Sequence, residues 1–317
     1  MILKNVYGKD LKIEIVDNEK DATFITHSGT FHADEVMATV FLLNKFGDIK
    51  LFRTSNPTND KAFIYDVGFG EFDHHQKEFD KVRKNGIKYA SCGLIWNAFG
   101  KDIIEKLNIS NVDEAHDAID RNLVMDIDRD DNGQTLANEP EIKILGVPNL
   151  IGNFNPSWNE DNMESQCFLN ALSFANDIFN NIIKNVIAKE AAKEIVEKSI
   201  DESENKIIIL NKYMPWKDIV LSSKKEKAKE ILYAVFPSKR GGYNIVATPV
   251  VKDSFNVKKP FPSAWAGLES DALKKISGIK TIKFCHKGLF ICACETYQDA
   301  LKIANIAVKN EEYNDLI

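Results

Sequence analysis

The stretch from Ala22 to Phe46, ATFITHSGTFHADEVMATVFLLNKF, decides the fold of the first part of the chain. Its first five residues, Ala22–Thr26, are apolar or β-branched and predict a buried strand. From Asp34 to Phe46 apolar residues occupy most positions and predict a helix, which Gly47 ends. A loop that carries two histidines therefore follows a strand and opens a helix.

The segments on the C-terminal side of this stretch repeat the alternation. Short apolar runs predict strands at Ile49–Arg53 and Ala62–Tyr65, and a helix is predicted at Ala90–Phe99, ended by Gly100. Another helix is expected from Val112 to about Asp128. Strands that alternate with helices predict βαβ units and a mostly parallel sheet, so the fold class is α/β.

The second half of the chain has a different pattern. Residues 134–162 are polar, contain three prolines and predict a connecting region, and a helical pattern of one or more helices follows from about Met163 to Glu202. Strands are then predicted at Lys206–Leu210, Ile231–Phe236, Tyr243–Val250, Thr281–Cys285 and Leu289–Ala293, with a turn at Arg240–Gly242 and helices at Asp271–Ile276 and Thr296–Lys309. This is a second, smaller α/β domain. We expect three parts: residues 1–150, a helical connector 151–205, and residues 206–317.

Composition narrows the class of protein. The 317 residues are 44% hydrophobic and 28% charged, which excludes disordered, collagen-like and mucin-like chains. The net charge of −6 hides a split: residues 206–317 hold 19 basic and 11 acidic side chains, and residues 1–205 hold 22 basic and 36 acidic ones. The acidic part suits cations and the basic part suits anions.

The cellular compartment is also indicated. Five cysteines, an odd number in a long chain, favour a reducing compartment. No secretory signal is recognised at the N-terminus, and the longest apolar stretch, Val36–Leu43, is too short to span a bilayer. We expect a soluble intracellular protein, cytoplasmic and without a membrane partner.

Histidine and aspartate concentrate in three segments. These are Thr26–Glu35, Asp66–Gly68 and Phe72–Gln76, and four of the six histidines lie between residues 27 and 75. In an open α/β sheet, ligands bind beyond the carboxyl ends of the strands, where these segments would meet. Imidazole and carboxylate ligands suit Mn, Fe, Zn or Co better than Mg alone, and a two-metal site with a bridging Asp accounts for their number. The alternative is that these residues only cap helices and turns.

The motifs THSGTFHADE at residues 26–35, YDVG at 65–68 and FDHHQ at 72–76 resemble the Myg-type family (melanocyte proliferating gene family), a branch of the DHH phosphoesterase superfamily. The resemblance continues through Ser91–Ile95, Asp128–Gly133, Asn155–Asn159, Pro215–Lys217, Trp265–Leu268, Ser277–Ile279 and Phe284–His286. It implies a DHH-like sheet with helices on both faces and a divalent-metal-dependent phosphoesterase, with 3′–5′ exoribonuclease activity attributed to members. Two metal ions are implied, with Mn²⁺ as the expected ion and Mg²⁺, Co²⁺, Fe²⁺ or Zn²⁺ as alternatives.

The metal pattern of the superfamily carries over onto this chain. By this resemblance His27 and His32 are ligands of one metal, and Asp34 and His74 are ligands of the other. Asp66 would bridge both metals. His32 stands where many superfamily members have an Asp, so it is the least typical ligand of the set.

Three further roles are implied. An Asp after the Val112 helix completes the second metal, and Asp128 is chosen over Asp131 although spacing does not separate them. His75 is the candidate for the acid or charge-stabilising role beside the metals, and Asp73 is expected to orient a histidine.

The C-terminal part departs from the family pattern. Family glycines after His286 are replaced by Leu289, Cys292 and Ala293, and a basic position is occupied by Glu295. Expected substrate contacts are the family-motif histidine and a pair of lysines interleaved with aromatic residues, namely His286, Lys258, Lys259 and Trp265.

The substrate therefore stays open between two classes. RNA or a short oligonucleotide is expected first, and a small phosphate ester or pyrophosphate is the alternative. A non-catalytic metal-binding protein is the third hypothesis, which an intact ligand set disfavours. The oligomeric state is open, a homodimer included.

Overall fold

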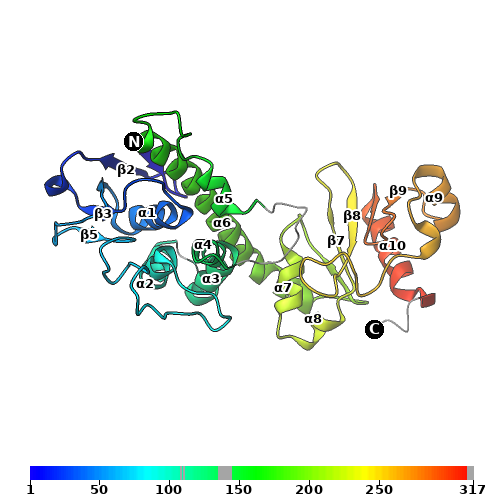
Figure 1. Cartoon of the computed structure of the whole chain (residues 1–317). Coiled ribbons are helices and arrows are strands. Elements are labelled where there is room, and N and C mark those ends of the chain that lie inside the picture. Colours follow the sequence, from blue (N-terminus) through cyan, green and yellow to red (C-terminus); the bar gives the residue numbers. More distant parts are fainter. Residues whose placement is uncertain (108, 110, 135–144, 313–317) are drawn as a thin grey trace. The chain divides into compact units, whose positions relative to one another are not determined.

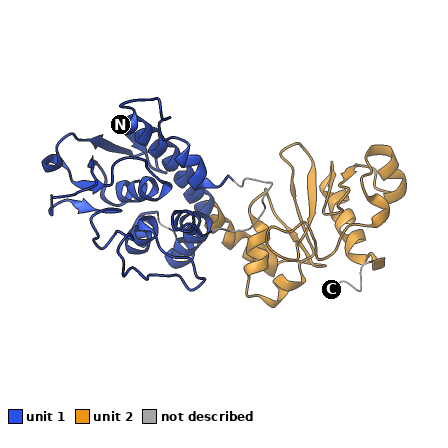
Figure 2. Cartoon of the chain, viewed as in Figure 1, with its two compact units in different colours: residues 1–187 blue, residues 188–317 orange. Residues whose placement is uncertain are grey.

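The structure is a computed structural model that describes residues 1–107, 109, 111–134 and 145–312. It is of the α/β class, as predicted, and the chain separates into two compact units, residues 1–187 and 188–317 (Figure 2). Each unit has its own five-stranded sheet. The polar region expected at 134–162 contains one short helix, and its residues 135–144 lie outside the described ones.

The sheet of the first unit, whose strands β2, β3 and β5 are labelled in Figure 1, has the strand order β1-β2-β4-β3-β5. Its strands are β1 (Ile2–Lys4), β2 (Asp10–Ile15), β3 (Phe24–Thr26), β4 (Ile49–Arg53) and β5 (Phe63–Ile64). The pairs β2–β4, β4–β3 and β3–β5 are parallel, and only β1–β2 is antiparallel. Because Thr26 pairs with Arg53 and Ile25 with Ile64, the adjacent parallel strands β4, β3 and β5 end at the same edge of the sheet. The loops after β3 and β5 therefore emerge together.

Helices of the first unit pack around this sheet. They are α1 (Ala33–Phe46), α2 (Ser91–Glu105), α3 (Val112–Ile119), a π-helical turn (Asp120–Val124), α4 (Met125–Asp131), α5 (Val147–Gly152) and the first half of α6 (Glu164–Asp201). Helix α1 is buried on almost all sides, as its sequence predicts, and the Phe41 ring meets Trp96 of α2 and Phe179 of α6 with centroids 4.8 and 5.1 Å apart.

Gly100 does not end α2, which corrects one expectation from the sequence. The helix continues to Glu105 because Gly100 lies against other side chains rather than at a turn. A Cβ on Gly100 would lie 2.7 Å from the Trp96 ring and 2.9 Å from His116, whose ring stacks on Trp96 at 5.1 Å. The glycine is required by close packing between α2 and α3.

Replacing Gly100 by alanine should destabilise the first unit even though alanine favours helices. Overpacking a tight site costs about 1–3 kcal/mol, which outweighs the gain in helix propensity of about 1 kcal/mol. Urea unfolding followed by tryptophan fluorescence should show a lower midpoint for Gly100→Ala. Gly152→Ala is the matched control, because no atom lies within 4 Å of a Cβ at that helical position, and its midpoint should not fall. An unchanged midpoint for Gly100→Ala would contradict the packing argument.

The second unit contains a mixed sheet of order β6-β7-β8-β10-β9. Its strands are β6 (Ile207–Ile209), β7 (Tyr233–Pro237), β8 (Tyr243–Ala247), β9 (Ile282–Cys285) and β10 (Ile291–Cys294), and its helices are α7 (Trp216–Ser222), α8 (Glu226–Glu230), α9 (Ser270–Ser277) and α10 (Tyr297–Lys309). β6 and β7 are parallel and the other neighbours antiparallel. The predicted hairpin turn at Arg240–Gly242 is confirmed, whereas α7 and α8 were not expected.

Helix α6 is one continuous helix of 38 residues. Its first half places Phe168, Leu172 and Phe179 in the core of the first unit. Its second half places Val196 and Ile200 in a core of the second unit. Within the described residues no helix, α6 included, is apolar over a length that would cross a bilayer.

Candidate metal centre

The edge where β3 and β5 end carries a pocket of about 600 Å³. Its lining residues include five that the sequence analysis selected, namely His27, His32, Asp66, Asp73 and His75. His27 follows β3 directly, and Asp66 comes two residues after β5. The parallel strands thus bring together side chains that are far apart in the sequence.

Asp66 lies between two groups of side chains. Its Oδ2 is 3.4 Å from Nε2 of His27, and its Oδ1 is 3.5 Å from Nε2 of His74. Ser91 donates a hydrogen bond from Oγ to the same Oδ1 at 3.0 Å. The residue is buried and its backbone adopts a φ of 57°, in the left-handed region that non-glycine residues rarely occupy. Strain of this kind is concentrated at functional sites, and here it turns the carboxylate toward both histidines.

The first group faces Oδ2 of Asp66. His27, His32 and Glu35 have ligand atoms within 4.8 Å of one another. Nε2 of His27 lies 2.8 Å from Oε1 of Glu35, and the backbone N–H of His32 donates to Oε2 at 2.9 Å. Glu35 is fully buried and was not selected from the sequence. Its place in the quoted motif, next to Asp34 on the first turn of a helix, was the signal that could have found it.

The second group faces Oδ1 of Asp66. Asp34, His74 and Asp131 also have ligand atoms within 4.8 Å of one another. Nε2 of His74 lies 3.0 Å from Oδ2 of Asp131 and 3.8 Å from Oδ2 of Asp34. Asp131, the alternative ligand in the sequence analysis, therefore lies beside His74, whereas Asp128 lies with Asp34 and Cys92 in another such group.

Asp128 has other partners. Its Oδ2 lies 2.5 Å from the Arg83 guanidinium, and its Oδ1 accepts from the backbone N–H of Gly93 at 2.9 Å. A Cβ on Gly93 would overlap this carboxylate, which is why glycine stands there. Burial raises the pKa of Asp128 to about 7 in spite of the ion pair with Arg83. Asp128 thus fastens α4 to α2.

The N-terminus of α2 holds the Asp34 carboxylate. The backbone N–H groups of Ser91 and Cys92 donate to its two oxygens at 3.0 and 2.6 Å. The first amides of a helix are unpaired within the helix and attract anions. Each carboxylate oxygen keeps a second lone pair, so Asp34 can still bind a cation on its other side.

His75 and Asp73 form a pair at the pocket. Nδ1 of His75 lies 2.7 Å from Oδ1 of Asp73, whose Oδ2 accepts from the backbone N–H of Phe69 at 2.7 Å. Asp73 is buried, whereas more than half of the His75 side chain is exposed. The hydrogen bond to Asp73 raises the pKa of His75. The arrangement holds an accessible, readily protonated imidazole beside Asp66.

The charges of the site fit bound cations. Burial, and then the charges of Asp66, Asp131 and Asp128, raise the pKa of Asp34 well above its usual value. Burial would lower the pKa of His27 and of His74, but their carboxylate neighbours outweigh it and raise these values to about 11 and about 10. Burial would also raise the pKa of Asp66, yet the hydrogen bonds and charges of the two histidines lower it. The buried carboxylates thus raise the pKa of both histidines. Positive charge is favoured in this space, and carboxylate with imidazole is a donor set suited to divalent ions.

Arg53 supports the loop that carries His27, and this role was not predicted from the sequence. Its guanidinium donates to the backbone oxygens of His27 and Gly29, both at 3.1 Å, and to Glu164 at 2.7 Å. Its planar group also lies 4.5 Å from the Phe168 ring centroid. A basic residue at the end of a central strand was its only sequence signal.

Loss of this anchor should loosen the loop. Arg53→Met keeps an apolar stem but removes three charge-assisted hydrogen bonds, each worth about 1.5–3 kcal/mol, so amide exchange in residues 27–32 should accelerate roughly tenfold or more. Hydrogen–deuterium exchange read by mass spectrometry measures this. Arg121→Met, at an exposed site on the π-helical turn, is the control. Equal exchange in the two variants would contradict the anchoring role.

The expected substrate contacts lie in the second unit and do not form one surface. Trp265 and Lys259 are only 4% and 3% exposed. Trp265 stacks on Phe261, and Lys259 donates to the Val308 carbonyl at 2.8 Å. Lys258 is half-buried and donates to the Lys229 carbonyl at 2.8 Å. These three side chains brace the unit and offer little to a substrate.

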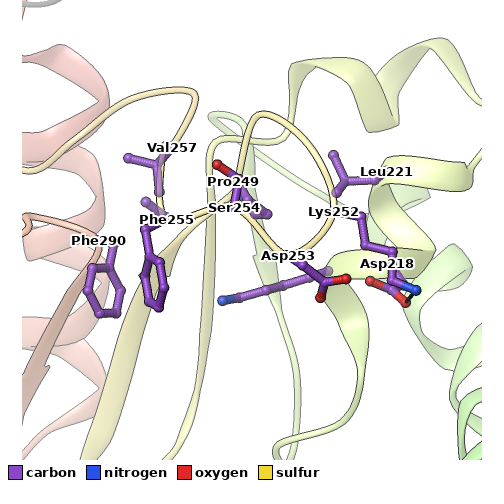
Figure 3. A pocket seen from close by; sticks show the side chains of 11 residues that line it. Asp218, Leu221, Pro249, Lys252, Asp253, Ser254, Phe255, Val257 and Phe290 are labelled. Carbon is purple, nitrogen blue, oxygen red and sulfur yellow. Dashed lines mark ion pairs between the residues drawn. The ribbon is translucent and has the colours of Figure 1, made fainter. Parts of the chain in front are cut away.

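His286 has a different setting. It is exposed, and its ring lies 4.4 Å from that of Phe290, which in turn lies 5.9 Å from Phe255. Phe255 and Phe290 line a pocket of about 280 Å³ in which Lys252 pairs with Asp218 (Figure 3). His286 therefore lies beside the half-buried Phe290, which in turn lies beside the exposed Phe255.

Comparison with known proteins gives consistent matches. A family model for MYG1 exonucleases, described as "Uncharacterised protein family (UPF0160)", matches residues 23–308. A MYG1 protein of Saccharomyces cerevisiae is 30% identical over 319 residues, covering 89% of this chain and 94% of that protein. The MYG1 exonuclease of Homo sapiens is 26% identical over 323 residues, covering 91% and 86%. No solved structure gives a significant match.

Proposed function

The chain belongs to the MYG1 family, and on that premise we propose that it is a divalent-metal-dependent phosphoesterase of the 3′–5′ exoribonuclease type. The observation that carries the proposal is the position of Asp66, whose two oxygens face two separate groups of metal-ligand side chains. The human, mouse and rat relatives are named exonucleases, which agrees with this class of reaction.

The proposed ligand sets follow the two groups. His27, His32 and Glu35 hold one ion, and Asp34, His74 and Asp131 hold the other, with Asp66 shared. Asp131 replaces Asp128 in this assignment, because Asp128 is engaged by Arg83. Mn²⁺ is the proposed ion, since imidazole and carboxylate together suit it better than Mg²⁺.

Two divalent ions at such a site supply an activated water and charge neutralisation for phosphoryl transfer. The chain's own residues supply the rest. Asp73 accepts from Nδ1 of His75 and fixes the ring, which leaves Nε2 to exchange a proton with a substrate oxygen. The raised pKa of His75 favours the protonated ring that a general acid or a charge-stabilising group requires.

The substrate class is proposed as RNA or a short oligonucleotide. A small phosphate ester or pyrophosphate is the second candidate, favoured by one observation: Leu289, in place of a family glycine, has a φ of 56° and puts a side chain where glycine would have none. Hydrolysis of labelled RNA, DNA, dinucleotides and pyrophosphate with Mn²⁺ tests the proposal. Cleavage of pyrophosphate alone would favour the second candidate, and no cleavage of any of them would contradict both.

Metal content should follow the ligand assignment. The parent protein should bind close to two Mn²⁺ ions per chain, because the two groups share one bridging carboxylate. Asp66→Ala should retain almost none and Asp131→Ala about one, as measured by elemental analysis after dialysis against Mn²⁺.

Asp128→Asn is the matched control for Asp131→Ala. It should keep both ions but unfold at lower denaturant, because breaking a buried ion pair costs about 3–5 kcal/mol. Loss of one ion from Asp128→Asn, with full content in Asp131→Ala, would restore Asp128 as the ligand. Full content in Asp66→Ala would contradict the bridging role.

His75 should matter for hydrolysis and not for metal content. His75→Ala should keep both ions and lower kcat on RNA by about 10²–10⁴-fold, the scale of losing an acid–base or charge-stabilising group. Lys77→Ala, an exposed neighbour on the same loop, serves as the control and should leave kcat unchanged. Loss of metal from His75→Ala would instead make His75 a ligand.

Other parts of the proposal follow from the fold. The first unit would carry the catalytic centre, and the basic second unit would bind substrate. An intracellular, cytoplasmic location is proposed, and the five free thiols support a reducing compartment.

A further inference from the structure

The sheet of the second unit is covered differently on its two faces. Helices α9 and α10 pack on one face, where Tyr233, Ile245 and Cys292 contribute to the core. On the other face the end of α6, with α7 and α8, covers Ala234 and Val246, and Ile291 lies at the margin of that cluster. The part of this second face formed by β10 and β9 lies outside that cluster, apart from Ile291.

A row of side chains crosses this second face. Phe236 pairs with Asn244, Asn244 with Ala293, and Ala293 with Phe284, so the four residues lie side by side across β7, β8, β10 and β9. A pocket of about 600 Å³ lies over the row. Tyr213, which is 59% exposed, lies beside Phe236 with ring centroids 5.5 Å apart. The pocket therefore offers the exposed ring of Tyr213 and the partly exposed ring of Phe284 on one face of the sheet.

The rim of this pocket is basic. Lys239 and Arg240 come from the β7–β8 turn, and Lys283 comes from β9. Among the described residues, none of these three cations forms an ion pair with a carboxylate, and no acidic side chain is found in the pocket lining. Lys283 makes only a long contact, 3.5 Å, to the Gly241 carbonyl. Three uncompensated cations around aromatic rings favour an anionic, planar ligand.

We propose that this surface binds single-stranded nucleic acid. We name it the sheet platform and define it by its aromatic, amide and basic side chains, Tyr213, Asn244, Phe284, Lys239, Arg240 and Lys283. Bases stack on Tyr213 and Phe284, and phosphates contact the three cations. The inference rests on the proposed function, because the bound strand is taken to be the RNA substrate, but the platform is distinct from the metal centre and from His286.

The chemistry favours a strand over other anions. Open sheets that carry aromatic side chains bind single strands by stacking, and stacking is worth about 1–3 kcal/mol per base. A duplex hides its bases and would leave the rings without partners. A lone phosphate would use the cations but not the rings, and an acidic protein segment would likewise gain little from Tyr213.

Binding to the full chain tests the platform. Fluorescence anisotropy would follow a labelled oligouridine of about a dozen nucleotides, within the usual site sizes of such proteins, in EDTA so that no hydrolysis occurs. The double variant K239A/R240A should bind at least tenfold more weakly at low salt. The slope of log Kd against log salt concentration should fall by about 1.4, because each single-strand phosphate contact contributes about 0.7.

Tyr213→Ala separates stacking from charge. It should weaken binding at least about fivefold while leaving the salt slope unchanged, since it removes a ring and no charge. The matched control is K224A/K275A, two exposed lysines on a loop and on α9, which removes the same charge away from the platform and should bind like the parent. Equal losses in K224A/K275A and K239A/R240A, or parental binding by both platform variants, would overturn the proposal.

Binding of an acidic peptide of similar length tests whether the surface binds acidic protein segments instead of RNA. If K239A/R240A weakens the peptide as much as the RNA and Tyr213→Ala changes neither, the surface is a docking site for acidic protein segments and the proposal is wrong. Failure of the proposed function looks different: no substrate would be hydrolysed with Mn²⁺, yet oligouridine binding would still depend on the platform.

Discussion

The first turn of α2 is the constraint on which the proposed metal centre depends. Its backbone amides hold Asp34 from α1 and Asp128 from α4, and its Ser91 hydroxyl holds Asp66. Three carboxylates of like charge would otherwise repel one another in a buried space. Unpaired helix amides offset part of that repulsion and fix where each oxygen points. The spacing of the ligand groups is therefore set by a helix that supplies no ligand side chain in the proposed assignment.

The sheet sets the other half of the geometry. Parallel register between β3 and its neighbours brings two distant loops to one edge, and the left-handed backbone at Asp66 turns its carboxylate between them. A flexible backbone at Asp66 would let its carboxylate turn toward one histidine and away from the other. The strained, buried conformation keeps both oxygens engaged, which is the condition that a shared ligand must satisfy.

Much of the first unit was predictable because its signals are local. Buried strands such as Ile49–Arg53 and the apolar helix after Asp34 follow from composition and spacing, and histidines at strand ends indicated the site. The sequence does not separate Asp131 from Asp128 as a candidate ligand, and it does not place Glu35 in the site. Both depend on contacts in space, between Arg83 and Asp128 and between His27 and Glu35. The expectation that Gly100 ends α2 was wrong for a similar reason. In sequence, a glycine that ends a helix cannot be told from one that leaves space for a neighbouring tryptophan ring. β2 was missed although Asp10–Ile15 alternates strictly, and Lys259 was expected to contact substrate although its ammonium donates to the Val308 carbonyl.

Helix α6 has a consequence for how the protein is made. Its first half completes the core of the first unit with Phe168, Leu172 and Phe179. A nascent chain that has left the ribosome only to residue 150 lacks these side chains and exposes the faces of α1 and α2 that they cover. Synthesis proceeds at about 5–20 residues per second, so this interval lasts seconds, long enough for a chaperone to bind. The side chains proposed as metal ligands all precede residue 132, so they are synthesised before the helix that completes the core around them.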